Sequence, residues 1–177
     1  MNRISLTMAR DIYKAAHIGG TSGASAKEAA GGHFDKYLLM ANPRLLGSIS
    51  AELATRIPVG SEVLAGIELG GIPIVTVLSM ETNIPAAFIR KKASGINKLT
   101  EGTAIHGKRV CVVHDVVVTG SHIVRSVNDL REAGAVVNDV ICIIESNPEA
   151  RANLQAAGLR FHALFTLEQL VLAGESE

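Results

Sequence analysis

The stretch "RVCVVHDVVVTGSHIVRSVNDLREAGAVV", residues 109–137, combines an apolar run, a polar turn and an amphipathic segment. Residues 110–113 are apolar on both faces and mostly β-branched, which is typical of a strand inside a parallel sheet. Asp115 follows at the end of this strand, where we expect a loop edge outside the core. The turn then delivers Thr119, Gly120 and Ser121 to the start of a helix that stops at Gly134, a residue type common just after a helix.

The same alternation of strands and helices extends along the chain. Apolar runs predict strands at 62–67, 86–90, 109–115, 137–145 and 161–165. Helical spacing predicts helices at 1–17, 42–57, 71–83, 121–134, 147–158 and 166–174, with Asn42 and Thr166 as caps. Strands that are apolar on both faces and alternate with helices predict an α/β fold, with a parallel sheet and helices on both faces.

The length of 177 residues suits one domain with a substantial core. We expect a single domain over 1–177, made of an α/β core at 41–177 and a small N-terminal hood at 1–40. Residues 19–32, "GGTSGASAKEAAGG", are rich in small residues and predict a mobile loop or linker.

Composition excludes several classes of partner. The chain has 17 Lys plus Arg and 17 Asp plus Glu, so no overall field favours nucleic acid or an anionic membrane. It has no apolar run long enough for a membrane span, and its first residues lack the apolar core of a secretory signal, so we expect a cytoplasmic protein. Cys111 and Cys142 lie in strand-like runs and are expected to be reduced core thiols. No Cys/His spacing predicts a zinc site.

The turn after Asp115 has the chemistry of a phosphate cup. A helix N-terminus presents free N–H groups and a partial positive charge, and Gly120 permits close approach of a ligand. Thr119 and Ser121 add hydroxyl groups, and the carboxylate of Asp115 can accept hydrogen bonds from sugar hydroxyls. A plain strand, surface turn and capped helix is the alternative for this stretch taken alone.

The segment "VCVVHDVVVTGS" resembles the phosphoribosyl-pyrophosphate (PRPP) motif of type I phosphoribosyltransferases. The segments "FDKY", "LAGIELGGIPIVTVLSMETNIPAAFIRKKA", "LTEG" and "LFTLEQL" resemble orotate phosphoribosyltransferases in particular, and the similarity covers residues 33–172. The resemblance implies the type I fold, PRPP and a nitrogenous base as substrates, Mg²⁺ as cofactor, and a homodimer. Site residues follow from matched positions: for PRPP, His114, Asp115, Val118, Thr119, Gly120, Ser121, Glu68, Leu69, Gly70, Gly71, Arg90 and Lys91; for the base, Phe34 and Lys36; for catalysis, Asp115, Lys91 and Lys98; and for the metal, Asp115.

The chain departs from the family pattern in three places. His114 stands where the family has an acidic residue, and it can bond a hydroxyl or pair with Asp115. Val118 replaces a Thr and Ser121 a Gly in the cup. The loop "RKKASGINKLTEG" lacks the family's Lys at its usual position, which leaves Lys92 or Lys98 as substitutes.

The cation that binds orotate in the family is also absent after the strand at 138–145, and Arg151 is expected to lie too far along its helix. We therefore expect weak binding of orotate, or competition from uncharged bases. An orotate phosphoribosyltransferase is the favoured function. The alternatives are a phosphoribosyltransferase for another base and a regulator that binds PRPP or a nucleotide without turnover.

Overall fold

The computed structural model describes residues 3–16, 35–90 and 99–176. Its sheet has the strand order β3-β2-β1-β4-β5-β6, and every neighbouring pair is parallel except β2 and β3. The strands are β1 (Val63–Ile67), β2 (Ala86–Ile89), β3 (Thr100–Gly102), β4 (Arg109–Val117), β5 (Val136–Glu145) and β6 (Arg160–Thr166). The predicted parallel sheet is confirmed. The short antiparallel β3 was not predicted, because "TEG" carries no apolar signal.

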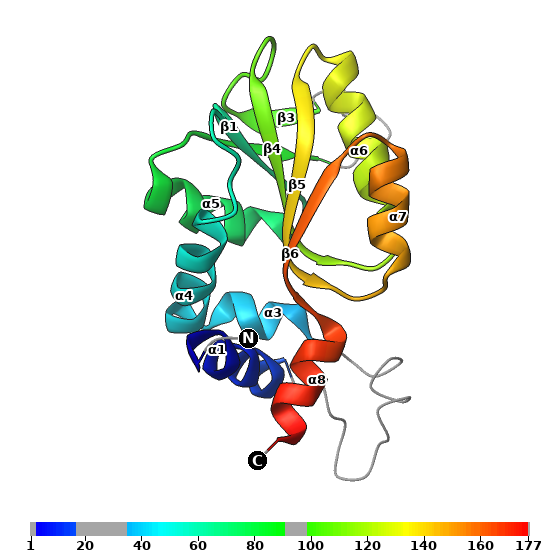
Figure 1. Cartoon of the computed structure of the whole chain (residues 1–177). Coiled ribbons are helices and arrows are strands. Elements are labelled where there is room, and N and C mark those ends of the chain that lie inside the picture. The colour runs from blue at the N-terminus through cyan, green and yellow to red at the C-terminus, as the bar shows by residue number, and fades with distance from the viewer. Residues whose placement is uncertain (1–2, 17–34, 91–98, 177) are drawn as a thin grey trace.

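Helices cover both faces of the sheet, as predicted (Figure 1). Helices α4 (Pro43–Ala54) and α5 (Gly71–Thr82) pack on one face, and α6 (Ser121–Glu132) and α7 (Glu149–Ala156) on the other. Asn42 caps α4 by accepting from the backbone N–H of Leu45, and Thr166 closes a capping box with Gln169 at the start of α8.

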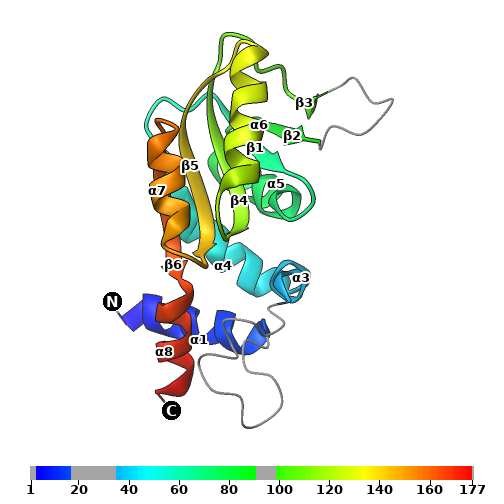
Figure 2. The ribbon, with the colours of Figure 1, turned by 90° about the vertical axis from the view of Figure 1, so that its right-hand side faces the viewer.

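Three helices gather beyond the carboxyl ends of the strands (Figures 1 and 2). They are α1 (Arg3–Ala15), α3 (Lys36–Ala41) and α8 (Leu167–Glu175). The hood was expected over residues 1–40. Helix α3, which was not predicted, begins within that range, and α8 packs against α1 although it lies far along the chain. The predicted loop at 19–32 lies outside the described residues. Among the described helices, none combines the length and apolar character that a membrane crossing requires.

The hood shares its core with the sheet. One cluster joins Ile12 of α1, Leu39 of α3 and Leu170 of α8 to residues of α4, α5 and the sheet. A second cluster lies under α6 and α7. Cys111 and Cys142 are free and buried, which confirms that they are core thiols. Because the hood and the sheet are packed together, side chains of the hood are held over the sheet edge.

Candidate active site

Asp115 lies inside β4 and its side chain is fully buried. The expectation that it sits on a loop edge outside the core is wrong. Val116 and Val117 extend the strand, since they pair in register with Ile144 and Glu145 of β5. Asp115 is therefore a charged group placed within the core at the carboxyl end of the sheet, where parallel α/β folds bind ligands.

His114 contacts Asp115 directly. Its Nδ1 lies against Asp115 Oδ1, and the ring is only 5% exposed. The backbone N–H of Asp115 lies 2.9 Å from the same nitrogen. One nitrogen cannot accept and donate at once, so we assign its proton to the bond with the charged carboxylate. The prediction that His114 can pair with Asp115 agrees with this geometry.

A second histidine completes this contact. His122, in the first turn of α6, places its Nε2 2.9 Å from Nε2 of His114. The ring planes meet at 72°. With Nδ1 of His114 protonated, its Nε2 accepts the proton of His122. His122 was not predicted as a site residue, because its contact with His114 depends on how the turn brings α6 back to β4.

Lys36 approaches Asp115 from the hood. Its Nζ lies 2.9 Å from Asp115 Oδ2, in an ion pair rather than a directed hydrogen bond. Asp35 positions the lysine by capping α3 through the N–H of Tyr37. Lys36 is one of the two residues that the resemblance assigns to the base. It lies on α3 and not after β5, where the family's cation for orotate was looked for.

These contacts set the charge of Asp115. Burial alone would raise the pKa of its carboxyl group. The hydrogen bond from His114 lowers the pKa, as does the positive charge that this ring has when it is protonated. Together with Lys36 and the N–H of Val116, these effects outweigh burial and hold the pKa of the carboxyl group well below its usual range. Asp115 is thus ionised at neutral pH. Its Oδ2 has no directed hydrogen bond among the described residues, which leaves acceptor capacity for a ligand.

The turn of residues 68–71 follows β1 and packs on the same carboxylate. A Cβ built on Gly70 would lie 1.7 Å from Asp115 Oδ2, so no larger residue fits without movement. Glu68 is half-buried and Leu69 is 62% exposed, and a cis peptide bond joins them. Gly71 begins α5. The structure therefore brings the predicted diphosphate turn against Asp115.

The predicted phosphate cup surrounds the start of α6. Gly120 has φ +75 and a Cβ there would meet Leu154, so both conformation and space favour glycine. The hydroxyl groups of Thr119 and Ser121 lie 3.2 Å apart and are exposed. Asn153 of α7 donates to the carbonyl of Thr119 and braces the turn. Val118 is half exposed and adds no polar group.

The remaining predicted residues lie at the margin. Arg90 directly follows β2, and its guanidinium is 3.9 Å from Glu101. Lys91, Lys92, Lys98 and Phe34 lie outside the described residues. Arg151 donates to Glu145 at 2.6 Å and to the carbonyl of Phe161, so it is engaged away from Asp115.

The described residues hold no group of three His, Cys, Asp or Glu side chains suited to a metal ion. Magnesium in nucleotide sites usually uses one or two carboxylates together with substrate phosphates and water. Asp115, with its available Oδ2, fits such a substrate-carried Mg²⁺.

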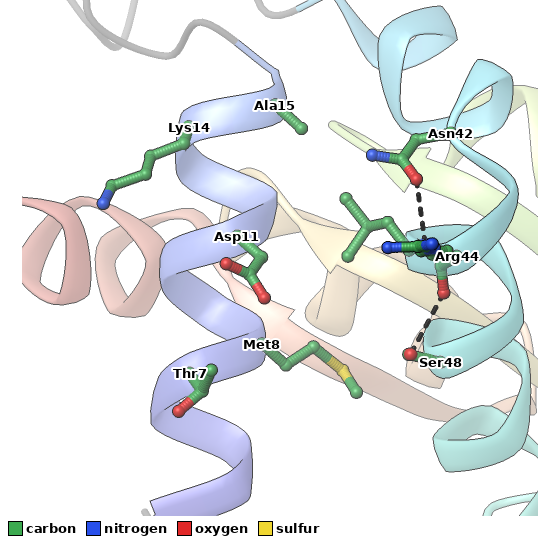
Figure 3. Close-up of a pocket in the computed structure, with 9 residues that line it drawn as sticks. Thr7, Met8, Asp11, Lys14, Ala15, Asn42, Arg44 and Ser48 are labelled. Carbon is green, nitrogen blue, oxygen red and sulfur yellow. Dashed lines mark hydrogen bonds between the residues drawn. The ribbon is translucent and has the colours of Figure 1, made fainter.

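A cavity of about 800 Å³ lies between α1 and α4, away from this edge (Figure 3). In Figure 3, Asp11 of α1 faces Arg44 and Ser48 of α4, whereas the side chain of Lys14 points to the other side of α1. It contains none of the residues that converge on Asp115, so we place the site at the sheet edge rather than in this cavity.

Known proteins share both sequence and fold with this chain. No family model matches it. The orotate phosphoribosyltransferase of Nocardioides sp. is 37% identical over 175 residues, which cover 98% of each chain. A phosphoribosyltransferase structure from Corynebacterium diphtheriae has a TM-score of 0.76 at 25% identity, covering 96% of this chain and 99% of the other. The Mycobacterium tuberculosis orotate phosphoribosyltransferase in complex with PRPP has a TM-score of 0.74 at 22% identity, covering 96% and 93%, and supports the fold. The confirmed type I fold and the identity over nearly the whole length establish that the chain belongs to the orotate phosphoribosyltransferase family.

Proposed function

We propose that the chain transfers the phosphoribosyl group of PRPP to orotate, which yields orotidine 5′-phosphate and pyrophosphate. The observation that carries the proposal is the arrangement around Asp115. The turn at 68–71 packs on its carboxylate, Lys36 of the hood forms an ion pair with it, and His122 holds the start of α6 against the neighbouring His114. A relative named orotate phosphoribosyltransferase is 37% identical over 98% of the chain.

Each part of PRPP has a counterpart in this arrangement. The N–H groups at the start of α6, with Thr119 and Ser121, suit the 5-phosphate. The carboxylate of Asp115 suits the ribose hydroxyls. The turn at 68–71 suits the diphosphate, because it has backbone N–H groups and because Gly70 lets the turn pack directly against the carboxylate of Asp115. PRPP would thus span from α6 to α5 across the end of β4.

The reaction replaces one bond to the anomeric carbon with another. A ring nitrogen of the base loses its proton and forms a bond to C1 of the ribose. The C1–O bond breaks with its electron pair leaving on the diphosphate, which can take up that proton. The ribose becomes positively charged in the transition state. The ionised carboxylate of Asp115 lies where it can stabilise that charge, since it is buried and not screened by water.

The cofactor proposed for this site is Mg²⁺, held by Asp115 and by oxygen atoms of PRPP. When bound, Mg²⁺ neutralises charge on the departing diphosphate. Arg90, which directly follows β2, is proposed to add positive charge to the diphosphate. Lys91 and Lys98 keep their proposed catalytic role by resemblance.

Lys36 is the proposed partner of the base. Its ammonium is about one third exposed and already lies at Asp115. When Mg²⁺ and PRPP engage Asp115, the ammonium can turn to the anionic orotate. This role removes the reason for expecting weak orotate binding. No feature of the site favours another base or a non-catalytic regulator.

The test mixes the protein with Mg²⁺, PRPP and a panel of orotate, uracil, adenine and hypoxanthine, and measures pyrophosphate release. We expect release with orotate well above release with the other bases. Release with a different base, or PRPP binding without any release, would contradict the proposal.

We also propose that the protein is a homodimer, which the family resemblance implies. Sedimentation at micromolar concentration should give twice the chain mass of 18.6 kDa. A monomer that turns over at full rate would contradict this assembly.

A further inference from the structure

We propose that His114 and His122 form a binding site for one divalent transition-metal ion, distinct from the Mg²⁺ that accompanies PRPP. His114 comes from β4 and His122 from the first turn of α6. Their Nε2 atoms lie 2.9 Å apart. Imidazole nitrogen is a preferred ligand of Zn²⁺, Ni²⁺ and Cu²⁺, whereas Mg²⁺ prefers oxygen.

The separation of the two nitrogens suits shared coordination. Metal–imidazole bonds are about 2.1 Å long, so an ion bound to both atoms at their present separation makes an N–metal–N angle of about 90°. That angle is the one between adjacent ligands in tetragonal sites, which favour Ni²⁺ and Cu²⁺. The ion takes the place of the proton that the two nitrogens share.

Asp115 supplies the usual support for such a ligand. A histidine that binds a metal commonly donates its other ring N–H to a carboxylate, which fixes the ring and raises its basicity. Here Nδ1 of His114 contacts Asp115 Oδ1, and burial of the ring holds it in place. His122 is exposed, so water reaches the remaining coordination positions.

This site goes beyond the proposed transfer reaction and has only two protein ligands. It is therefore not one of the groups of three His, Cys, Asp or Glu side chains, of which the described residues contain none suited to a metal ion. It also matches no common sequence motif, because the seven residues between the two histidines include the turn before α6. A metal ion bound here would lie beside the phosphate cup. It would also act on the carboxylate of Asp115 through the ring of His114, which contacts both.

The test is a calorimetric titration of the untagged full-length protein with Ni²⁺ alone, with no substrate present. We expect one tight site per chain. Loss of a supporting carboxylate typically lowers metal affinity by about 10- to 100-fold, so loss of a ligand in His122→Ala should lower it at least as much. Because substrates are omitted, failure of this test says nothing against transfer.

His162→Ala is the matched control, since His162 is an exposed histidine on β6 outside the site. It should bind Ni²⁺ as the parent does. His114→Ala removes a buried ring and can destabilise the fold, so the exposed His122 carries the decision, with circular dichroism to check folding. Equal affinity in parent and His122→Ala, or no binding by the parent, would overturn the proposal.

Discussion

Two aspartates are buried in the same sheet, and their partners differ in kind. Asp139, near the start of β5, accepts two hydrogen bonds of 2.7 and 2.8 Å from the guanidinium of Arg160 on the adjacent strand. Both of its oxygens are satisfied. Asp115, near the end of β4, meets His114 and a lysine from the distant hood, and its Oδ2 keeps acceptor capacity.

The difference separates a structural carboxylate from a ligand-binding one. The Asp139–Arg160 pair is complete within the sheet and its guanidinium faces water, where an ion pair contributes little. Asp115 is a buried charge whose partners can be rearranged. Burying such a charge costs stability, and a protein retains it where the charge binds a ligand. The comparison predicts that changes near Asp115 alter function and that changes near Asp139 do not.

The largest expected effect follows Asp115→Asn. The amide keeps the shape but loses the charge that faces the ribose, so kcat/KM should fall by on the order of 10- to 1000-fold. Because Asp115 is buried between His114 and Lys36, the free energy of unfolding should also change. Steady-state kinetics and thermal melts measure the two effects.

Asp139→Asn is the matched control for that substitution. It should change the melting temperature little and leave kcat/KM unchanged, because the ion pair with the exposed Arg160 contributes little. If both variants lose activity equally, the distinction between the two carboxylates fails.

Gly70→Ala is expected to have the next largest effect. The added methyl group meets Asp115 Oδ2 and must displace it, so turnover should fall by roughly 10- to 100-fold. Gly47→Ala is the control, because a Cβ on Gly47, within α4, meets nothing within 4 Å. That variant should keep full activity and gain stability, since alanine favours a helix interior.

Lys36→Met should raise the KM for orotate by roughly tenfold, the size of one lost charge-assisted contact. Lys108→Met removes an exposed partner of Glu62 at the opposite edge of the sheet and should change neither KM nor kcat. Initial rates at varied orotate and saturating PRPP decide between them. An unchanged KM in Lys36→Met would remove Lys36 from the base site.

The sequence predicted the sheet and the helices that cover it, because long apolar runs and caps such as Asn42 and Thr166 act locally. It missed α3, which has six residues, and β3, which has three, since neither is long enough to show a period. It placed Asp115 at the correct strand, but could not show that Val116 and Val117 extend the ladder and bury it.

Contacts across the site were harder to predict than the residues themselves. Asp115, Gly70 and Gly120 carry motif signals, so each was found from sequence. The approach of Lys36 to Asp115, and of His122 to His114, depends on the packing of the hood and on the angle of the turn before α6. Such geometry has no fixed spacing along the chain.

The smallest expected effect is at the two thiols, which report on the two aspartates separately. Cys111 pairs in register with Asp139, and Cys142 pairs with His114. Burial, and then the charge of Asp139, raises the pKa of Cys111 to about 12, and burial raises that of Cys142 well above its usual value. A thiol reacts as its thiolate, so at pH 8 both should react with a disulfide reagent only when the structure opens.

PRPP with Mg²⁺ should therefore slow labelling of Cys142 more than labelling of Cys111, because the ligand binds at the Asp115 end. Labelling followed by peptide mass spectrometry separates the two sites, and Cys111→Ala and Cys142→Ala variants check the assignment. Equal slowing of both thiols would mean that the sheet opens as one unit. Stronger protection of Cys111 would place the ligand at the Asp139 end and contradict the site described above.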